Sequence, residues 1–266
     1  MNARVTVNGT ELNTRIDGPD NAPWLVLSNS LASNLHMWDT QIPWLSRHFR
    51  VLRYDTRGHG ASATPPGPYH FDDLVADVIG LMDRHAIEDA RFMGLSMGGM
   101  TALGLALAHP GRFKGLICCA ARADGPEGFA AMWDQRIAQV RDQGMGALVQ
   151  GTLERWLTEG FRQREPAETD RIGAMIRDTD PAGYIGCAQA IQRLDYLRHL
   201  DHVSVPLLYV GGEVDAGAMP DVMQAMADRT PGGRFHMIPN AAHIVNIDNP
   251  TAFNAAIAPF LGIGLD

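Results

Sequence analysis

Short apolar runs alternate with amphipathic stretches along most of this chain. Each apolar run has the length of one strand and is rich in aliphatic and aromatic residues, which is typical of strands buried in a parallel sheet. The predicted strands span residues 24–28, 50–54, 91–95, 115–120, 206–211 and 234–238. The amphipathic stretches predict the helices that connect parallel strands. These helices lie near residues 72–85, 97–109, 220–229 and 249–261.

The N-terminal segment follows a different pattern, in which polar and apolar residues alternate. Residues 4–7 and 11–16 show this alternation and are joined by Asn8-Gly9-Thr10. Asn-Gly between two alternating segments is a strong hairpin signal. We therefore expect an antiparallel hairpin at one edge of the sheet. The hairpin and the six parallel strands together predict a mostly parallel, doubly wound, eight-stranded sheet with helices on both faces.

One long segment interrupts this alternation. Between residues 121 and 205 there is no convincing buried strand, only helical patterns rich in Gln, Arg, Met and Trp. A structureless loop of this length is implausible in a compact domain, so we interpret the segment as an inserted helical lid. The predicted core comprises residues 1–121 and 205–266, and the predicted lid comprises residues 122–204. The apolar positions of the lid are typical of a packing face: Met132, Trp133, Ile137, Val140 and Met145.

Length and charge limit the classes of protein to consider. The 266 residues suffice for one large α/β domain or for a core with an inserted subdomain. Apolar residues make up 45% and charged residues 20%, which excludes disordered, collagen-like and coiled-coil classes. The net charge is −8 and the basic residues are scattered, so we expect no nucleic-acid or anionic-membrane partner. A small anionic substrate stays possible, because a single buried arginine can bind one carboxylate.

The remaining composition signals predict a cytoplasmic protein without a cofactor. Cys118, Cys119 and Cys187 form neither a disulfide framework nor a metal-type spacing, so we expect buried, reduced thiols. The N-terminus has no apolar core of signal-peptide length, and no run of 18 apolar residues occurs. There is also no Walker motif, no His-Glu-x-x-His and no paired CxxC. We therefore expect no metal and no cofactor.

The clearest chemical motif is Gly94-Leu95-Ser96-Met97-Gly98, between a predicted strand and a predicted helix. This is the context of a Gly-x-Ser-x-Gly nucleophile elbow. A sharp strand-to-helix turn brings neighbouring backbones together and strains the serine, so the flanking positions have no room for a Cβ. The motif predicts Ser96 as a nucleophile at the carboxyl edge of the sheet.

A serine nucleophile needs a base, and the base needs an orienting carboxylate. In the fold typical of this elbow the order along the chain is serine, acid, histidine. Asp215 follows the predicted strand 206–211, and His243 follows the last predicted strand. Glu213 and Asp221 compete with Asp215 for the role of the acid. We favour Asp215, because it lies deeper in the loop and aspartate is the commoner choice in such triads.

The developing oxyanion of an acyl-transfer reaction needs two backbone N–H donors. One comes from the residue after the nucleophile, which is Met97. The other comes from the loop after the third strand, and within SNSLAS we assign it to Leu31. Because the donors are main-chain groups, the side chains at these positions are weakly constrained.

These residues carry a resemblance to a known family. The chain resembles the α/β-hydrolases throughout its length, and within them the 3-oxoadipate enol-lactonases. The Asn29-Ser30 pair is the most telling feature, because most relatives have His-Gly there whereas the enol-lactonases show Asn-Ser. The segment DTRGHG from Asp55, with Ser62, belongs to the whole superfamily. The segments that carry the resemblance are LSNSLASNLHMWDTQIPWL, FRVLRYDTRGHGAS, GPYHFDDLVADVIGLMD, MGLSMGGM and HIVNID.

The resemblance implies a substrate class. It implies hydrolysis of a five-membered enol-lactone that carries a carboxymethyl side chain, in the catabolism of aromatic compounds, through an acyl-enzyme. The predicted lid is similar to that of the family at its entry, around Arg122, Trp133 and Arg136, and at its exit, from Gly183. Either Arg136 or Arg122 would then pair with the substrate carboxylate, and Trp133 would wall the pocket.

The sequence departs from the family pattern near the expected pocket. Ala32 stands where the family usually has glycine, and Val245 replaces a small polar residue after the histidine. The acid loop reads DAGAMP, where a turn rich in Pro and Thr is typical. The triad chemistry should survive these changes, whereas a related lactone or ester could be the substrate.

Other functions are compatible with the same residues. A carboxylesterase, a perhydrolase and a C–C bond hydrolase can all use this triad, and substrate profiling separates them. A more remote alternative is a non-catalytic ligand receptor on a hydrolase scaffold, because fold does not dictate function. The sequence leaves the oligomeric state undetermined.

Overall fold

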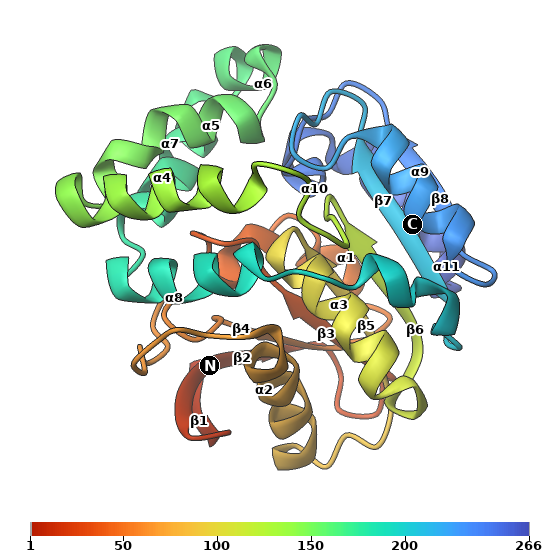
Figure 1. Cartoon of the computed structure of the whole chain (residues 1–266). Coiled ribbons are helices and arrows are strands. Elements are labelled where there is room, and N and C mark those ends of the chain that lie inside the picture. The colour runs from red at the N-terminus through yellow and green to blue at the C-terminus, as the bar shows by residue number, and fades with distance from the viewer. Residues whose placement is uncertain (1, 266) are drawn as a thin grey trace.

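The computed structural model describes residues 2–265 and contains one sheet of eight strands (Figure 1). Their spatial order is β1-β2-β4-β3-β5-β6-β7-β8. β2 pairs antiparallel with β1 and β4, whereas all other neighbours are parallel. The strands are β1 (Asn2–Val7), β2 (Thr10–Asp17), β3 (Trp24–Ser28), β4 (Arg50–Tyr54), β5 (Ala90–Leu95), β6 (Phe113–Cys119), β7 (Leu207–Gly212) and β8 (Arg234–Ile238).

The first two strands form the predicted hairpin. Val7 pairs with Thr10, so the turn consists of Asn8 and Gly9, whose φ angles are 45° and 70°. Positive φ at both central residues is the geometry that Asn-Gly favours, because its twist matches the twist of the flanking strands. The hairpin therefore closes one edge of the sheet, as the sequence predicts.

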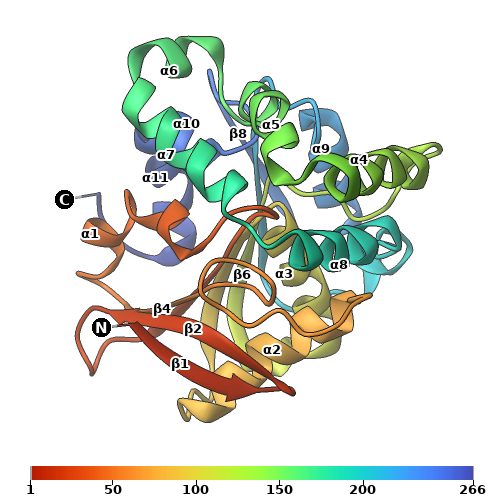
Figure 2. The same cartoon turned by 90° about the vertical axis from the view of Figure 1, so that its left-hand side faces the viewer.

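Helices cover both faces of the sheet. Figure 2 shows α1 and α11 on one side of the sheet and α2, α3 and α9 on the other. This is the doubly wound arrangement that right-handed crossovers produce. The helices of the core are α1 (Ile42–Leu45), α2 (Phe71–Arg84), α3 (Met97–Ala108), α9 (Pro220–Arg229), α10 (Val245–Asp248) and α11 (Pro250–Leu261). Short 3-10 helices are η1 (Leu35–Trp38), η2 (Pro110–Arg112), η3 (Met145–Leu148) and η4 (Leu197–His202).

The segment between β6 and β7 is helical, and we call its helices α4 to α8 the cap helices. They lie together beyond the end of the sheet (Figure 1). Buried apolar residues of α4, Trp133, Ile137 and Val140, form the packing face that the sequence predicts. The cap helices are α4 (Phe129–Gln143), α5 (Val149–Trp156), α6 (Glu159–Arg164), α7 (Pro166–Arg177) and α8 (Pro181–Gln192). The division into core and lid at residues 122 and 204 stays a prediction.

One predicted strand has a different environment from that expected. Residues 234–238 form β8 as predicted, but of these only Ile238 is buried, and Met237 is 45% exposed. The prediction of a buried strand is wrong here, because β8 is the last strand of the sheet and has a neighbour on one side only. The interior strands β3 and β4 are buried from their second residue onward. Hydrophobic content alone does not distinguish an edge strand from a central one.

The three cysteines are free and buried, as expected. Cys118 and Cys119 lie at the end of β6, and Cys187 lies on α8. Burial raises the pKa of all three thiols above the ordinary value. Within residues 2–265, no helix is both long and apolar enough to cross a membrane.

We predict that the native protein resists thiol reagents. The thiolate is the reactive form, and burial disfavours it and blocks access. Ellman's reagent at pH 8 should label none of Cys118, Cys119 and Cys187 in the folded protein and all three in guanidinium chloride. Rapid labelling of one thiol without unfolding would contradict this expectation.

Candidate active site

Ser96 lies on the sharp turn that joins β5 to α3. Its φ of 56° is in the left-handed region, which costs free energy for a residue with a side chain. A Cβ on Gly94 would overlap the carbonyl of Gly98, and a Cβ on Gly98 would overlap the carbonyl of Ser28. The two glycines therefore permit the close approach of three backbone segments, and the turn holds Ser96 at the carboxyl end of β5.

Side chains from three separate loops form a hydrogen-bonded chain at this edge. His243 Nε2 lies 2.9 Å from Ser96 Oγ, and His243 Nδ1 lies 2.8 Å from Asp215 Oδ2. His243 follows β8 and Asp215 follows β7. A neutral imidazole with its proton on Nδ1 donates to Asp215 and accepts from the Ser96 hydroxyl. This is the arrangement that a general base for a serine nucleophile requires.

Asp215 is a buried carboxylate that stays ionised. Burial by itself would raise the pKa of Asp215, but the charge and hydrogen bond of His243 lower it below the ordinary value. The backbone N–H groups of Gly217 and Ala218 also donate to Oδ1, at 2.7 and 3.2 Å. The side chain is 1% exposed, so the carboxylate has a defined orientation toward His243.

The two competing carboxylates lie elsewhere. Glu213 is exposed and accepts from the backbone N–H of Asn240 at 2.8 Å. Asp221 is exposed at the start of α9 and accepts from the N–H of Val222. Neither is hydrogen-bonded to His243, so the geometry agrees with the choice of Asp215.

The backbone N–H groups of Leu31 and Met97, the two predicted oxyanion donors, lack among the described residues the acceptors that the N–H groups of the next residues have. Gly98 N–H donates to Asn29 O at 3.0 Å, and Ala32 N–H donates to His59 Nε2 at 3.0 Å. Within residues 2–265, the N–H groups of Leu31 and Met97 have no such acceptor. Both N–H groups are therefore available to a substrate oxygen, and the bond between Gly98 and Asn29 holds the two loops together.

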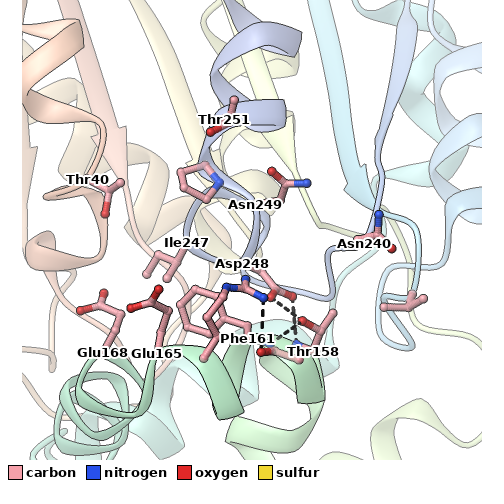
Figure 3. Close-up of a pocket in the computed structure, with 14 residues that line it drawn as sticks. Thr40, Thr158, Phe161, Glu165, Glu168, Asn240, Ile247, Asp248, Asn249 and Thr251 are labelled. Atoms are coloured by element: carbon pink, nitrogen blue, oxygen red, sulfur yellow. Dashed lines mark hydrogen bonds between the residues drawn. The ribbon is translucent and has the colours of Figure 1, made fainter.

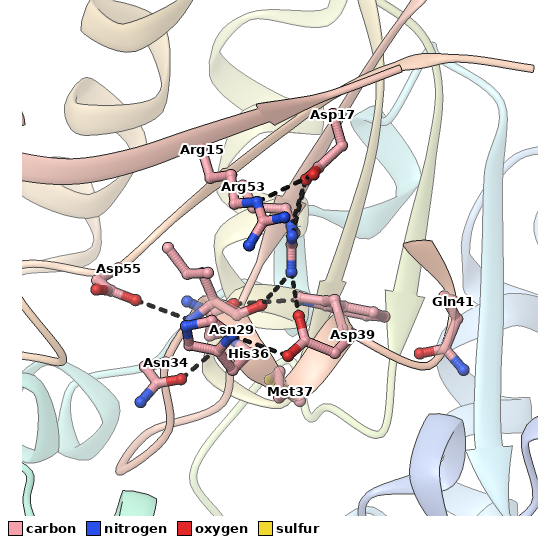
Figure 4. Close-up of polar contacts among 12 residues, drawn as sticks. Arg15, Asp17, Asn29, Asn34, His36, Met37, Asp39, Gln41, Arg53 and Asp55 are labelled. Atoms are coloured by element: carbon pink, nitrogen blue, oxygen red, sulfur yellow. Dashed lines mark hydrogen bonds and ion pairs between the residues drawn. The ribbon is translucent and has the colours of Figure 1, made fainter. Parts of the chain in front are cut away.

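The loop after β3 is anchored by a buried polar network (Figure 4). Asn29 is fully buried: its amide donates to Tyr54 O at 2.6 Å and its oxygen accepts from Trp38 Nε1 at 3.1 Å. Asp55 Oδ1 accepts from the N–H of Leu35 at 2.8 Å. Within the Asn29-Ser30 pair, which carries the resemblance to the enol-lactonases, Ser30 lines the cavity of Ser96. Asn29 does not line it and instead holds the backbone of this loop in place.

His59 also holds the loop after β3, through a hydrogen bond from the N–H of Ala32. Ala32 has a φ of 61°, which explains why glycine is usual at this position and how alanine can replace it at some cost. His59 Nδ1 lies 3.1 Å from Arg57 O, so it donates there while Nε2 accepts from Ala32. Burial lowers the pKa of His59, against the opposing effect of the bond to Arg57. This structural role fits the place of His59 in DTRGHG, the segment shared by the whole superfamily.

Ser96 opens into a cavity of about 420 Å³, within the range of small-molecule sites. The cavity is lined by the core loops and by the cap helices, and all three predicted lid residues, Trp133, Arg136 and Arg122, line it. A larger groove of about 890 Å³ is lined by α6 and the start of α7 and, from the core, by the end of α10 and the start of α11 (Figure 3). Its lining includes neither Ser96 nor His243.

The guanidinium groups in the Ser96 cavity have different partners. Arg122 lies 3.6 Å from Asp124, so its charge is partly compensated. Arg136 lies over the ring of Trp133 at 4.8 Å, and within residues 2–265 it has no carboxylate partner. Arg155, which sequence analysis missed, also lines the cavity, and its pKa is lowered by partial burial and by the charge of Arg136. The two like charges of Arg136 and Arg155 interact with each other and make this part of the cavity attractive to a carboxylate.

Aromatic residues of the cap complete the cavity. Trp156, at the end of α5, lies beside His243 with ring centroids 6.5 Å apart. Tyr184 of α8 is buried, and burial raises its pKa to about 12. The sequence contained no signal for Trp156 or Arg155 beyond their helical segment. Among the described residues, no group of three His, Cys, Asp or Glu side chains could hold a metal ion.

Comparison with known proteins places this site in a family. Residues 23–250 match the family described as alpha/beta hydrolase fold. The chain belongs to the alpha/beta hydrolase fold family. It is 36% identical to 3-oxoadipate enol-lactonase 2 of Acinetobacter baylyi, over 95% of this chain and 94% of the relative. Its relatives are hydrolases, and the chain is a hydrolase.

Solved structures give the same result for this hydrolase. The crystal structure of the enol-lactonase from Burkholderia xenovorans superposes with a TM-score of 0.94 at 41% identity, covering 98% of this chain and 100% of that one. A thermophilic esterase from Thermogutta terrifontis superposes with a TM-score of 0.91 at 28% identity, covering 98% of each chain. The fold class predicted from the sequence and the resemblance to enol-lactonases are confirmed.

We predict that His59 makes the stability of this hydrolase depend on pH. The folded pKa of His59 is below the ordinary value of 6.5, so below about pH 6.5 the unfolded chain binds more protons than the folded chain. The contribution of His59 is therefore complete above that pH and decreases as pH falls, by at most about 1.4 kcal/mol per pH unit.

Urea unfolding of the wild type and of His59→Gln, between about pH 5 and pH 7.5, tests this. The difference in free energy of unfolding between the two proteins should be larger at the upper pH than at the lower. A difference that does not change with pH would show that His59 titrates alike in both states.

Proposed function

We propose that this hydrolase opens a small lactone, 3-oxoadipate enol-lactone, with Ser96, His243 and Asp215 as its catalytic triad. The observation that carries the proposal is the hydrogen-bonded chain from Ser96 to Asp215 in a cavity that Arg136 also lines, and the guanidinium of Arg136 has no carboxylate partner within residues 2–265. The similarity to enol-lactonases over nearly the whole chain supports the choice of substrate.

The first step is acylation. His243 takes the proton of the Ser96 hydroxyl while Ser96 Oγ attacks the lactone carbonyl carbon, and Asp215 holds the imidazole and stabilises its positive charge. The carbonyl oxygen becomes an oxyanion, which accepts from the N–H groups of Leu31 and Met97. Because the elbow and the loop after β3 are already fixed, these donors need no reorganisation during the reaction.

The second step breaks the ring. The bond between the acyl carbon and the ring oxygen cleaves, and the electron pair leaves with that oxygen, which takes the proton that His243 received from Ser96. The resulting enol tautomerises to a ketone, and His243 is again neutral. This tautomerisation makes acylation effectively irreversible. A water molecule deprotonated by His243 then attacks the acyl-enzyme, and the proton returns from His243 to Ser96 Oγ as the acid leaves.

The substrate carboxylate is bound by the cap. Of the two arginines that the sequence left open, we propose Arg136, because Arg122 already faces Asp124 whereas Arg136 has no described carboxylate partner. Arg155 adds positive potential on the same side of the cavity. Trp133 forms the wall beneath the guanidinium of Arg136, which it also orients.

The departures from the family pattern leave this proposal intact. Ala32 has the positive φ that a glycine would adopt, and Val245 is fully buried at the start of α10. The N–H groups of the DAGAMP loop hold Asp215. The helical segment 122–204 acts in this proposal as a lid on the core formed by residues 1–121 and 205–266.

A comparison of substrates tests the function. We expect kcat/KM for freshly generated 3-oxoadipate enol-lactone to exceed that for p-nitrophenyl acetate and butyrate by orders of magnitude. Ser96→Ala should lower kcat by about 10³-fold or more, because it removes the nucleophile. Steady-state hydrolysis of each substrate by both proteins is the measurement.

Three results would contradict this function in different ways. If the esters are cleaved and the enol-lactone is not, the triad survives and the hydrolase is a carboxylesterase or acts on another small ester. If Ser96→Ala retains full activity, the triad itself is wrong. If the wild type hydrolyses none of these substrates, a receptor without catalysis becomes the alternative.

A pair of lactones tests the role of Arg136. We expect Arg136→Gln to lower kcat/KM for 3-oxoadipate enol-lactone by about 10- to 100-fold, which is the range for one charge-assisted hydrogen bond. α-Angelica lactone is an enol-lactone without a carboxylate, so its hydrolysis should change less than about twofold, because no such bond is lost. Arg122→Gln is the matched control and should have the smaller effect on the carboxylated substrate. Equal losses on both lactones would exclude carboxylate recognition by Arg136.

A further inference from the structure

Asp248, at the end of α10, is a buried carboxylate that does not line the Ser96 cavity. It is 4% exposed and comes five residues after His243. Its Oδ2 accepts from the N–H of Ala242 at 2.7 Å, and Ala242 directly precedes His243. No Lys, Arg or His within residues 2–265 forms an ion pair with it. The partners of this carboxylate are therefore neutral donors.

The other donors to Asp248 come from the cap helices (Figure 3). Thr158 N–H donates to Oδ2 at 3.0 Å and Thr158 Oγ1 donates to Oδ1 at 2.8 Å. Thr158 is the N-cap residue of α6, and its Oγ1 also accepts from the N–H of Phe161. One carboxylate thus bonds both the cap and the backbone beside the catalytic histidine.

A second link lies next to the first. The N–H of Ile244 donates to the carbonyl of Trp156 at 3.0 Å, and the ring of Trp156 lies beside the ring of His243. The two neighbours of His243 are therefore both linked to the cap turn 156–158. Ile244 is bonded to this turn directly, and Ala242 is bonded to it through Asp248. The position of this turn and the position of His243 are coupled.

We propose that Asp248 is a positioning residue that transmits the position of the cap to His243. This inference rests on the triad of the proposed function. With the cap turn bonded to Asp248, His243 Nε2 lies within hydrogen-bond distance of Ser96 Oγ. When the turn is released, the loop that carries His243 loses a constraint, and the proton transfer from Ser96 becomes slower. Catalytic competence is thereby coupled to the cap that recognises the substrate.

The chemistry of the bonds explains why a carboxylate suits this place. Two backbone N–H groups and one hydroxyl converge on it, and a carboxylate offers acceptors to all three. Asparagine could keep both N–H bonds through its oxygen, while its amide donates to Thr158 Oγ1. Alanine would remove every bond. Asp248→Asn is therefore a conservative variant and Asp248→Ala is a disruptive one.

The test measures the reaction of Ser96 with diisopropyl fluorophosphate. In this reaction Ser96 Oγ forms a bond to phosphorus, fluoride leaves, and His243 takes the proton. The rate therefore reports the Ser96–His243 pair without requiring the enol-lactone. Thr158 does not line the Ser96 cavity. Thr158→Ala removes the hydroxyl bond to Asp248 Oδ1 and keeps the backbone N–H bond to Oδ2, so it weakens the link at its cap end alone.

We expect Thr158→Ala to slow phosphorylation of Ser96 by about tenfold, because a displacement of 1 Å at a reacting group can cost about 100-fold. Asp248→Ala should slow it at least as much. Thr158→Ser and Asp248→Asn should restore rates within about threefold of wild type, because they keep the hydrogen bonds. Thr230→Ala is the control: it removes a buried hydroxyl that bonds Tyr209 and should leave the rate unchanged.

The outcomes separate the alternatives. If Thr158→Ala reacts as fast as wild type, the hydroxyl bond between Thr158 and Asp248 does not couple the cap to His243 and the proposal fails, even if Asp248→Ala is slow. If Thr230→Ala slows the reaction as much as Thr158→Ala does, the slower rate is a general effect of removing a buried hydroxyl and the proposal fails. Circular dichroism checks that both variants are folded. Wild-type protein that does not react at Ser96 would instead contradict the triad. Failure with the enol-lactone alone would contradict only the proposed substrate.

Discussion

The backbone at Ser96 is strained, and the rest of the site depends on how the sheet sustains that strain. A non-glycine residue in the left-handed region costs about 1–3 kcal/mol, so it persists only where its surroundings hold it. Here the N–H of Ser96 donates to Cys119 O on β6, and that of Gly98 donates to Asn29 O after β3. The strands on either side of β5 thus hold the turn, and this leaves the Met97 N–H free to stabilise an oxyanion.

Core and cap contribute different parts of the chemistry. In the proposed mechanism the core loops position the groups that make and break bonds. These groups come from positions far apart in the sequence, since Ser96 and His243 are separated by 147 residues. The cap contributes the guanidinium groups of Arg136 and Arg155 and the aromatic wall. This separation agrees with relatives that share the fold and differ in their named substrates, such as the enol-lactonase and the esterase.

Much of the fold could be predicted because its signals are local. The Asn8-Gly9 turn and the apolar runs are properties of a few neighbouring residues, and all the predicted strands are present within about two residues. β8 shows the limit of this reasoning. Its composition matches that of a buried strand, yet its exposure depends on which strands lie beside it, and the order of strands in space is not a local property.

The sequence alone predicted the hydrolase fold, which is confirmed, because a tight turn around Ser96 requires glycine at Gly94 and Gly98 and this requirement is visible in a few neighbouring residues. It also predicted Ser96, Asp215 and His243 as a triad in that order, and this assignment remains our proposal. Only the tertiary structure distinguishes the surroundings of Arg136 and Arg122, since Asp124 compensates the charge of Arg122 and no described carboxylate pairs with Arg136. It also decided the roles of His59 and Asp248, whose partners come from other segments of the chain. Such roles depend on distances across the folded molecule, which no local pattern of residues encodes.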